Sequence, residues 1–396
     1  MSGSLVTVLA VAALVPLLLG LVPRLPLPGP LVEIVAGVVL GPSVLGWVHA
    51  DETVSAVALL GLSFLLFLAG SEVDLRRFRG TTGRRVALSL LISVLAAGLV
   101  SGVLVALGVG GAPLLGVALL ATSLGLVVPV LADAGRLADP VGRLTIAGAS
   151  AGEIAAVVLL SVGLAGMDTP LAGRLLLLAL LVVALAAIGL TVLGAEHSMR
   201  ITALIERLAD TSAQIRVRLT VLLVAGLAFA AAALGFEAIL GAFLAGVLVR
   251  ALDPEPERTH PLYPVKLDAV GYGLLVPVFF VTSGLTLDLG GLVEHPTALA
   301  LVPAFLAALL LVRGLPALAL RGLLSGRETV AVALLQATSL PFLLAATEIG
   351  ERTGVLDPAV AAGLVAAGLV SVLVFPAAAL ALLARSPRAA APVGGP

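Results

Sequence analysis

The chain has 396 residues, of which 60% are hydrophobic and only 11% are charged. Its mean hydropathy of +1.22 excludes an ordinary soluble domain, in which about a quarter of the residues are charged. The composition therefore predicts a polytopic membrane protein. An all-α form follows, because lipid offers no water to backbone polar groups and the apolar runs are too long for the alternating strands of a barrel.

Apolar runs separated by charged or turn residues predict about thirteen membrane spans. The first run lacks the basic start and the cleavage site of a signal peptide, so we interpret it as a membrane helix. We expect one transmembrane domain over 1–396, with a short cytoplasmic tail at 385–396 and no C-terminal nucleotide-binding domain. The expected spans are 4–22, 30–48, 54–72, 85–108, 112–132, 143–166, 171–194, 216–234, 237–251, 268–287, 297–320, 328–349 and 358–384.

The basic residues predict the orientation of the chain in the cell membrane. Of the 22 Lys and Arg residues, only Arg174 and Arg352 fall in loops on one side, and Arg313 falls inside a span; all others lie on the opposite side. Because basic loops stay in the cytoplasm, we expect an outside N-terminus and a cytoplasmic C-terminus.

A short repeat indicates internal symmetry. The stretch Ala-Thr-Ser-Leu occurs at 121–124 in the fifth span and at 337–340 in the twelfth, and a proline follows each copy, Pro129 and Pro341. These two spans run in opposite directions through the membrane. The pattern predicts inverted repeats, at about 30–166 and 237–384, each with an interrupted helix whose ends and carbonyls hold an ion.

Two charged residues lie deep in predicted spans. Glu153 is the only ionisable residue between Arg143 and Met167, and it lies about 15 Å beyond Arg143 along a helix, near the middle of the hydrocarbon core. An acid at this depth is costly and usually functional. Arg313 lies about 12 Å from the end of its span and requires a partner or water. We predict Glu153 as that partner, and a purely structural salt bridge is the alternative.

Four stretches resemble motifs of a known family. They read PLVEIVAGVVLGPSVLG at 30–46, LFLAGSEVDL at 66–75, ILGAFLAG at 239–246 and PVFFVTSGL at 277–285. In this order they resemble the monovalent cation:proton antiporters of the sodium/hydrogen exchanger superfamily, in particular their Kef-type bacterial branch. The resemblance implies a homodimer, with one panel of helices that dimerises and a core in which two broken helices cross.

The resemblance also implies roles for single residues. Thr122 and Ser123 look like the first crossing, and Thr338 and Ser339 like the second. In the sixth span the family usually carries Asp-Asp or Asn-Asp, and Gly152-Glu153 stands at that place. The essential acid is thus one methylene longer and its neighbour has no side chain. Arg313 resembles the lysine or arginine that faces this acid.

Together these residues predict exchange of sodium or potassium for protons by alternating access. Burial favours the protonated form of Glu153 and Arg313 favours its carboxylate, so the acid is poised to release its proton. Arginine keeps its proton, so Glu153 alone carries the exchanged proton, and the exchange is expected to be electroneutral. The cation would bind with help from Thr122 and Ser123. We expect no enzyme activity, no cofactor, no resident metal and no nucleic-acid partner, but contact with membrane lipids.

Two alternatives remain open at this stage. One is a membrane sensor or scaffold that keeps the fold without turnover, with Glu153 and Arg313 as a fixed strut. Replacing Glu153 by Gln separates the two roles, because a transporter loses flux and stays folded, whereas a strut loses stability. The other alternative is a symporter or channel of similar architecture. A single carboxylate favours antiport, because exclusive occupancy by proton or cation couples the two fluxes.

Overall fold

The computed structural model describes residues 3–21, 28–73, 80–164, 170–196, 207–208, 211, 213–253, 259–287 and 296–384. The cytoplasmic tail expected at 385–396 and the basic residues Arg76, Arg77 and Arg79 lie outside these ranges.

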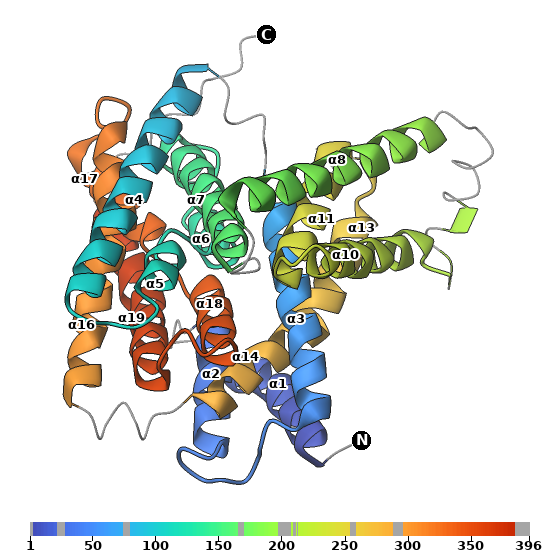
Figure 1. The fold of residues 1–396 in the computed structure, drawn as a ribbon, viewed down its shortest axis with the longest axis horizontal. Coiled ribbons are helices and arrows are strands. Elements are labelled where there is room, and N and C mark those ends of the chain that lie inside the picture. Colours follow the sequence, from blue (N-terminus) through green and yellow to red (C-terminus); the bar gives the residue numbers. More distant parts are fainter. Residues whose placement is uncertain are drawn as a thin grey trace. The chain divides into compact units, whose positions relative to one another are not determined.

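The described chain is helical, as the composition predicts (Figure 1). Short wide turns of π-helix (η2, η3) and a 3-10 turn (η4) interrupt two of the spans. The elements are α1 (Gly3–Leu21), α2 (Gly29–Leu40), α3 (Glu52–Ser71), α4 (Gly80–Ala106), α5 (Ala112–Ala118), α6 (Leu124–Asp133), α7 (Pro140–Leu164), α8 (Leu171–Glu196), α10 (Ile215–Ala233), α11 (Ala238–Leu252), α13 (Leu262–Val270), η2 (Gly271–Leu275), α14 (Val276–Thr286), α16 (Pro296–Leu309), η3 (Leu310–Gly314), η4 (Leu315–Leu320), α17 (Gly326–Gln336), α18 (Pro341–Arg352) and α19 (Pro358–Leu383).

The lengths of the helices suit a membrane. Within the described residues, ten helical stretches are long and apolar enough to cross a bilayer, and α2 and α11 are shorter apolar helices. Large apolar side chains such as Leu176, Leu190 and Phe229 are strongly exposed, which is expected where lipid rather than water surrounds the helix. The eighth and ninth predicted spans, which are separated only near Gly235, are two helices, and Gly235 takes the positive φ of 82° that turns the chain.

The chain forms two compact units. Unit 1 comprises residues 1–12, 50–75 and 157–282, and unit 2 comprises 13–49, 76–156 and 283–396. In unit 1, α3 and α11 pack closely because a glycine on each helix lies against the backbone of the other helix. A side chain at Gly70 would meet the carbonyl oxygen of Phe243, and one at Gly246 would meet that of Phe67. Such small-residue contacts let membrane helices approach closely.

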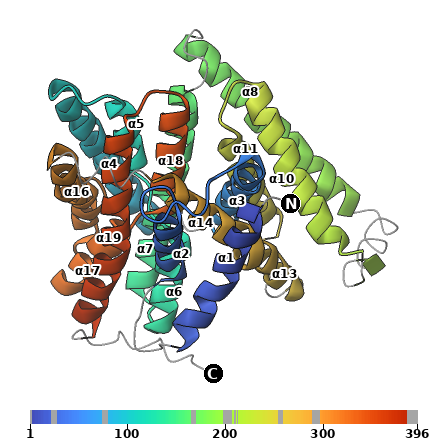
Figure 2. The same cartoon turned by 90° about the horizontal axis from the view of Figure 1, so that it is seen from below.

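Unit 2 contains the two interrupted helices. Helix is lost at 119–123 between α5 and α6, and at 337–340 between α17 and α18. Helix α5 packs against α18, and α6 shares an apolar core with α17 and α7 that includes Val127, Leu144 and Val332. In Figure 2, α5 and α18 lie towards one end of this unit and α6 and α17 towards the other. The two interrupted helices are therefore antiparallel, in agreement with the predicted inverted pair.

The prolines have different roles in the two copies. Pro341 is the first residue of α18, a position where proline lacks no needed hydrogen bond. Pro129 falls inside the bounds of α6 and not at the break. The first interruption is therefore set by the 119–123 stretch itself, and Ser123 is the residue that precedes α6 in extended conformation.

Candidate ion-binding site

The two breaks meet through their backbones and side chains. The backbone N–H of Ser123 donates to the carbonyl oxygen of Thr338 at 3.0 Å, and the hydroxyl of Thr122 donates to the carbonyl oxygen of Gln336 at 2.5 Å. The N-termini of α6 and α18 and the C-termini of α5 and α17 thus meet at one buried place. Partial positive and partial negative helix ends converge there, which is the arrangement needed to hold an ion in a membrane.

A serine on α19 fixes the second break. The hydroxyl of Ser371 donates to the carbonyl oxygen of Ser339 at 3.0 Å, and the N–H of Ser339 donates to the Ser371 hydroxyl at 3.3 Å. Ser339 and Ser371 are fully buried. These bonds give partners to the N–H and the carbonyl oxygen of Ser339, which have no helical hydrogen bonds at the break. They therefore hold the backbone of the break in one conformation.

Arg313 reaches the crossing from η3 and is only 1% exposed. Its Nε donates to the Thr122 hydroxyl at 2.9 Å, and its two terminal nitrogens donate to the Ser93 hydroxyl at 3.3 Å and to the Gly148 carbonyl oxygen at 2.7 Å. Three elements therefore supply uncharged acceptors to one guanidinium. This arrangement satisfies a cation that would otherwise be costly in the membrane interior.

Glu153 lies on α7 and is 5% exposed. It interacts electrostatically with Arg313. Its neighbour Gly152 places α7 against both Arg313 and the first break. A side-chain carbon at position 152 would lie 2.6 Å from the Cζ of Arg313 and 2.7 Å from the carbonyl oxygen of Leu120. The guanidinium therefore occupies the space that a side chain at this position would need.

Sequence reasoning overlooked three contributors to this cluster: Ser93 and Gly148, which accept from Arg313, and Gln336. Gln336 is fully buried, and a side chain at Gly148 would collide with its amide Nε2. The available signals were the spacing of four between Gly148 and Gly152, which clears one face of α7, and an amide directly before the repeated stretch. Ser93 gave no signal, because a serine in an apolar helix is common.

An ion network holds the distal ends of the same two interrupted helices. Arg136, which follows α6 and is almost fully buried, pairs with Asp139 and, at 2.9 Å, with Glu328 of α17. Glu328 also forms a capping box with Ser325 at the start of α17. The end of α6 is thereby tied to the start of α17.

Comparison with known proteins decides the family. The family model described as "Sodium/hydrogen exchanger, transmembrane" matches residues 9–384. The chain belongs to this family. Its members are transporters rather than enzymes, and the match establishes an integral multi-pass membrane protein of the kind that the four motifs resemble.

Several members of the family are similar over long stretches. YjbQ of Bacillus subtilis (strain 168) is 30% identical over 392 residues, which are 94% of this chain and 62% of YjbQ. The Na(+)/H(+)-K(+) antiporter GerN of Bacillus cereus is 28% identical over 271 residues, 68% of each protein. The chain thus spans somewhat under two thirds of YjbQ.

A solved structure shares the fold. The sodium proton antiporter MjNhaP1 from Methanocaldococcus jannaschii at pH 8 matches with a TM-score of 0.64 at 18% identity, covering 96% of this chain and 98% of that one. This likeness confirms the predicted sodium/proton antiporter fold.

Proposed function

We propose that this exchanger-family protein is a secondary transporter that exchanges a monovalent cation, sodium or potassium, for protons by alternating access. The observation that carries the proposal is Glu153, a buried acid beside the crossing of two interrupted helices in the middle of a membrane-spanning helix. Membership in the sodium/hydrogen exchanger family and similarity to proteins named as Na(+)/H(+) antiporters support it.

Glu153 is the group that proton and cation occupy in turn. The Arg313 guanidinium stays charged throughout, because arginine does not release its proton at accessible pH and its N–H groups are held by Thr122, Ser93 and Gly148. The carboxyl group is therefore the one that exchanges a proton. When deprotonated, the carboxylate attracts a cation from the side of the membrane to which the site is then open. Protonation removes the negative charge and releases the cation.

Thr122 can contribute one oxygen ligand to a bound cation. Its hydroxyl donates its proton to the Gln336 carbonyl oxygen and accepts one bond from Arg313, so one oxygen lone pair is left for a cation. Ser123 directly precedes α6, and its backbone and that of the neighbouring break at Thr338 and Ser339 supply further oxygen atoms. Gly152 supplies no side-chain ligand and gives the room in which Arg313 lies.

The exchange is one cation for one proton and is electroneutral. The proposal rests on a single exchanging carboxylate at the crossing. Transport by purified protein in liposomes is then expected to proceed at the same rate with and without an imposed membrane potential. A rate that follows the potential would contradict this stoichiometry.

We propose the orientation and assembly that the sequence predicts. The N-terminus faces outside and the C-terminus faces the cytoplasm of the cell membrane, because nearly all loop Lys and Arg residues then lie inside. The chain works as one transmembrane domain of two inverted repeats, about 30–166 and 237–384, and assembles as a homodimer in contact with lipid.

Dissipation of a pH gradient in proteoliposomes tests the proposal. Wild type is compared with Glu153→Gln, on addition of sodium and then of potassium, and Glu348→Gln serves as a control for an acid on α18 near its end. We expect dissipation by wild type and the control and none by Glu153→Gln, with all three folded by size-exclusion chromatography. Silence of folded wild type with both cations would favour the alternative of a non-transporting scaffold.

A further inference from the structure

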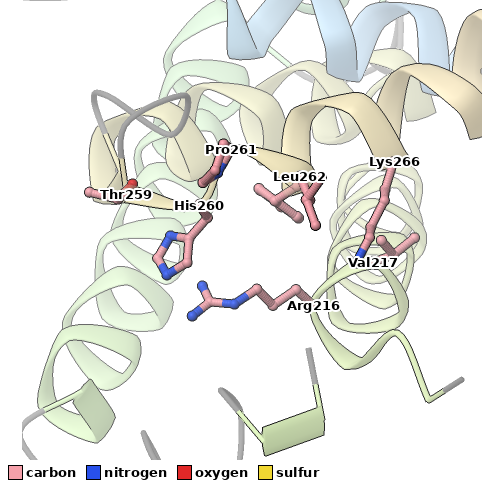
Figure 3. A pocket seen from close by; sticks show the side chains of 8 residues that line it. Arg216, Val217, Thr259, His260, Pro261, Leu262 and Lys266 are labelled. Atoms are coloured by element: carbon pink, nitrogen blue, oxygen red, sulfur yellow. The ribbon is translucent and has the colours of Figure 1, made fainter. Parts of the chain in front are cut away.

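Unit 1 contains a cavity outside the crossing. It has a volume of about 160 Å³ and lies where α10 and α13 begin, at Ile215 and Leu262. Figure 3 shows the side chains around it. The lining residues are Arg216, Val217, Thr259, His260, Pro261, Leu262, Tyr263 and Lys266.

The side chains that face this cavity are those of an anion site. Arg216 extends along it with its guanidinium beside the ring of His260, and Lys266 reaches from α13 towards Val217 (Figure 3). Among the described lining residues none is acidic, and Asp253 bonds to two of them, Thr259 and His260, from outside the lining. The Nε of Arg216 is buried and has no hydrogen-bond partner among the described residues. A buried guanidinium donor without an acceptor is costly, so this Nε is left for an acceptor from outside these residues, either water or a ligand.

The walls of the cavity are held in place by hydrogen bonds. The hydroxyls of Thr220 and Tyr263 lie 2.6 Å apart and join α10 to α13, and Thr220 also donates to the Arg216 carbonyl oxygen at 2.9 Å. On the far wall, Asp253 Oδ2 bonds Nδ1 of His260 at 3.1 Å and the Thr259 hydroxyl at 2.7 Å. These bonds therefore join the start of α10 to α13 and orient the His260 ring before a ligand arrives.

The position of the cavity relative to the membrane limits the kinds of ligand that can bind there. Both α10 and α13–α14 are membrane-spanning stretches, so their first residues lie at the level of the lipid headgroups. The N-terminus of α13 adds a partial positive charge to the two cationic side chains. Arginine and lysine together recognise phosphate oxygens, with the planar guanidinium donating in pairs.

We propose that this cavity binds a phosphate group, carried by an anionic membrane lipid or by a small soluble phosphate. The site is separate from the proposed transport chemistry, because it uses no residue of the crossing. Bound phosphate would join α10 to α13 through Arg216 and Lys266 and so stabilise unit 1.

Thermal unfolding in detergent, followed by far-UV circular dichroism, tests the site. Wild type, the double variant Arg216→Gln/Lys266→Gln and the control Arg218→Gln are compared; Arg218 lies one helical half-turn away, is exposed and does not line the cavity. Each is measured with added phosphatidylcholine, phosphatidylglycerol, or sn-glycerol 3-phosphate without lipid. We expect phosphatidylglycerol to raise the unfolding temperature of wild type and Arg218→Gln by several degrees over phosphatidylcholine, and that of the double variant by much less.

Comparison of the added ligands distinguishes a lipid phosphate from a soluble phosphate. Equal stabilisation by glycerol 3-phosphate alone, with no further gain from phosphatidylglycerol, would assign the site to a soluble ligand. Equal responses of wild type and the double variant to both ligands would overturn the proposal, as would an equal loss of response in Arg218→Gln, which indicates only surface charge. Should the double variant not fold, Lys266→Met alone is measured, and an unchanged response to both ligands would count against the site.

Discussion

Gly152 offers the sharpest test of how the crossing is packed. In Gly152→Ala the new carbon would lie 2.6 Å from Cζ and 2.7 Å from Nη2 of Arg313, and 2.7 Å from the Leu120 carbonyl oxygen. The arginine and the backbone of the first break both have to move. Displacing the guanidinium weakens at least one hydrogen bond to a charged group, worth about 1.5–3 kcal/mol. Overpacking against backbone costs about 1–3 kcal/mol more.

Replacing a helical glycine by alanine regains about 1 kcal/mol of helix propensity, so we expect a net loss of about 1.5–5 kcal/mol in the free energy of unfolding. The assay is denaturant unfolding in mixed micelles, with Gly98→Ala on α4 as the control, because nothing lies within 4 Å of a side chain added there. Equal stability of the two variants would refute the packing of Arg313 on Gly152. Gly152→Asp, which adds a second acid next to Glu153, is expected to destabilise at least as much.

Two further substitutions probe the contacts around the crossing. Thr122→Val removes the acceptor of the Arg313 Nε and the donor to the Gln336 carbonyl oxygen, and we expect it to destabilise the protein by about 2–3 kcal/mol. Thr122→Ser keeps the hydroxyl and should have a stability near that of wild type. Equal losses of stability in the two variants, measured by chemical unfolding, would contradict these hydrogen bonds. Glu328→Gln weakens a partly exposed ion pair with Arg136, so we expect the free energy of unfolding to fall by only about 1 kcal/mol. This difference from wild type should become smaller at high salt. A difference that does not depend on salt would show that the ion pair is not its cause.

Much of the fold was predictable because lipid imposes strong rules. Long apolar runs, loop charge and the repeated Ala-Thr-Ser-Leu stretch led to the helical spans and to an antiparallel pair of interrupted helices. The exact break was not predictable from proline alone, since Pro129 lies inside α6 and Pro341 opens α18. Proline marks where a helix lacks one donor, but the hydrogen bonds from the other break decide where helix ends.

The sequence indicated the two repeated Thr-Ser pairs at the breaks and the charged members of the candidate site, but not how they contact one another. Glu153 and Arg313 stand out because ionisable residues are rare in membrane spans. Their geometry did not follow from spacing. Residues on α4, on α7 and in the 119–123 break supply the acceptors of Arg313, and the wide turn η3 that carries it has no recognisable sequence pattern. The absence of a side chain at Gly152 also lacked its structural reason, which is the guanidinium packed on it.

The most direct test of the account is the affinity of purified protein for its cation as a function of pH. If proton and cation compete for Glu153, the apparent dissociation constant, measured by calorimetric titration with sodium or potassium, should rise by up to about tenfold for each unit that the pH falls below the proton-release range. Glu153→Gln should show no such cation binding. Affinity that stays constant with pH, or survives in Glu153→Gln, would contradict a shared carboxylate.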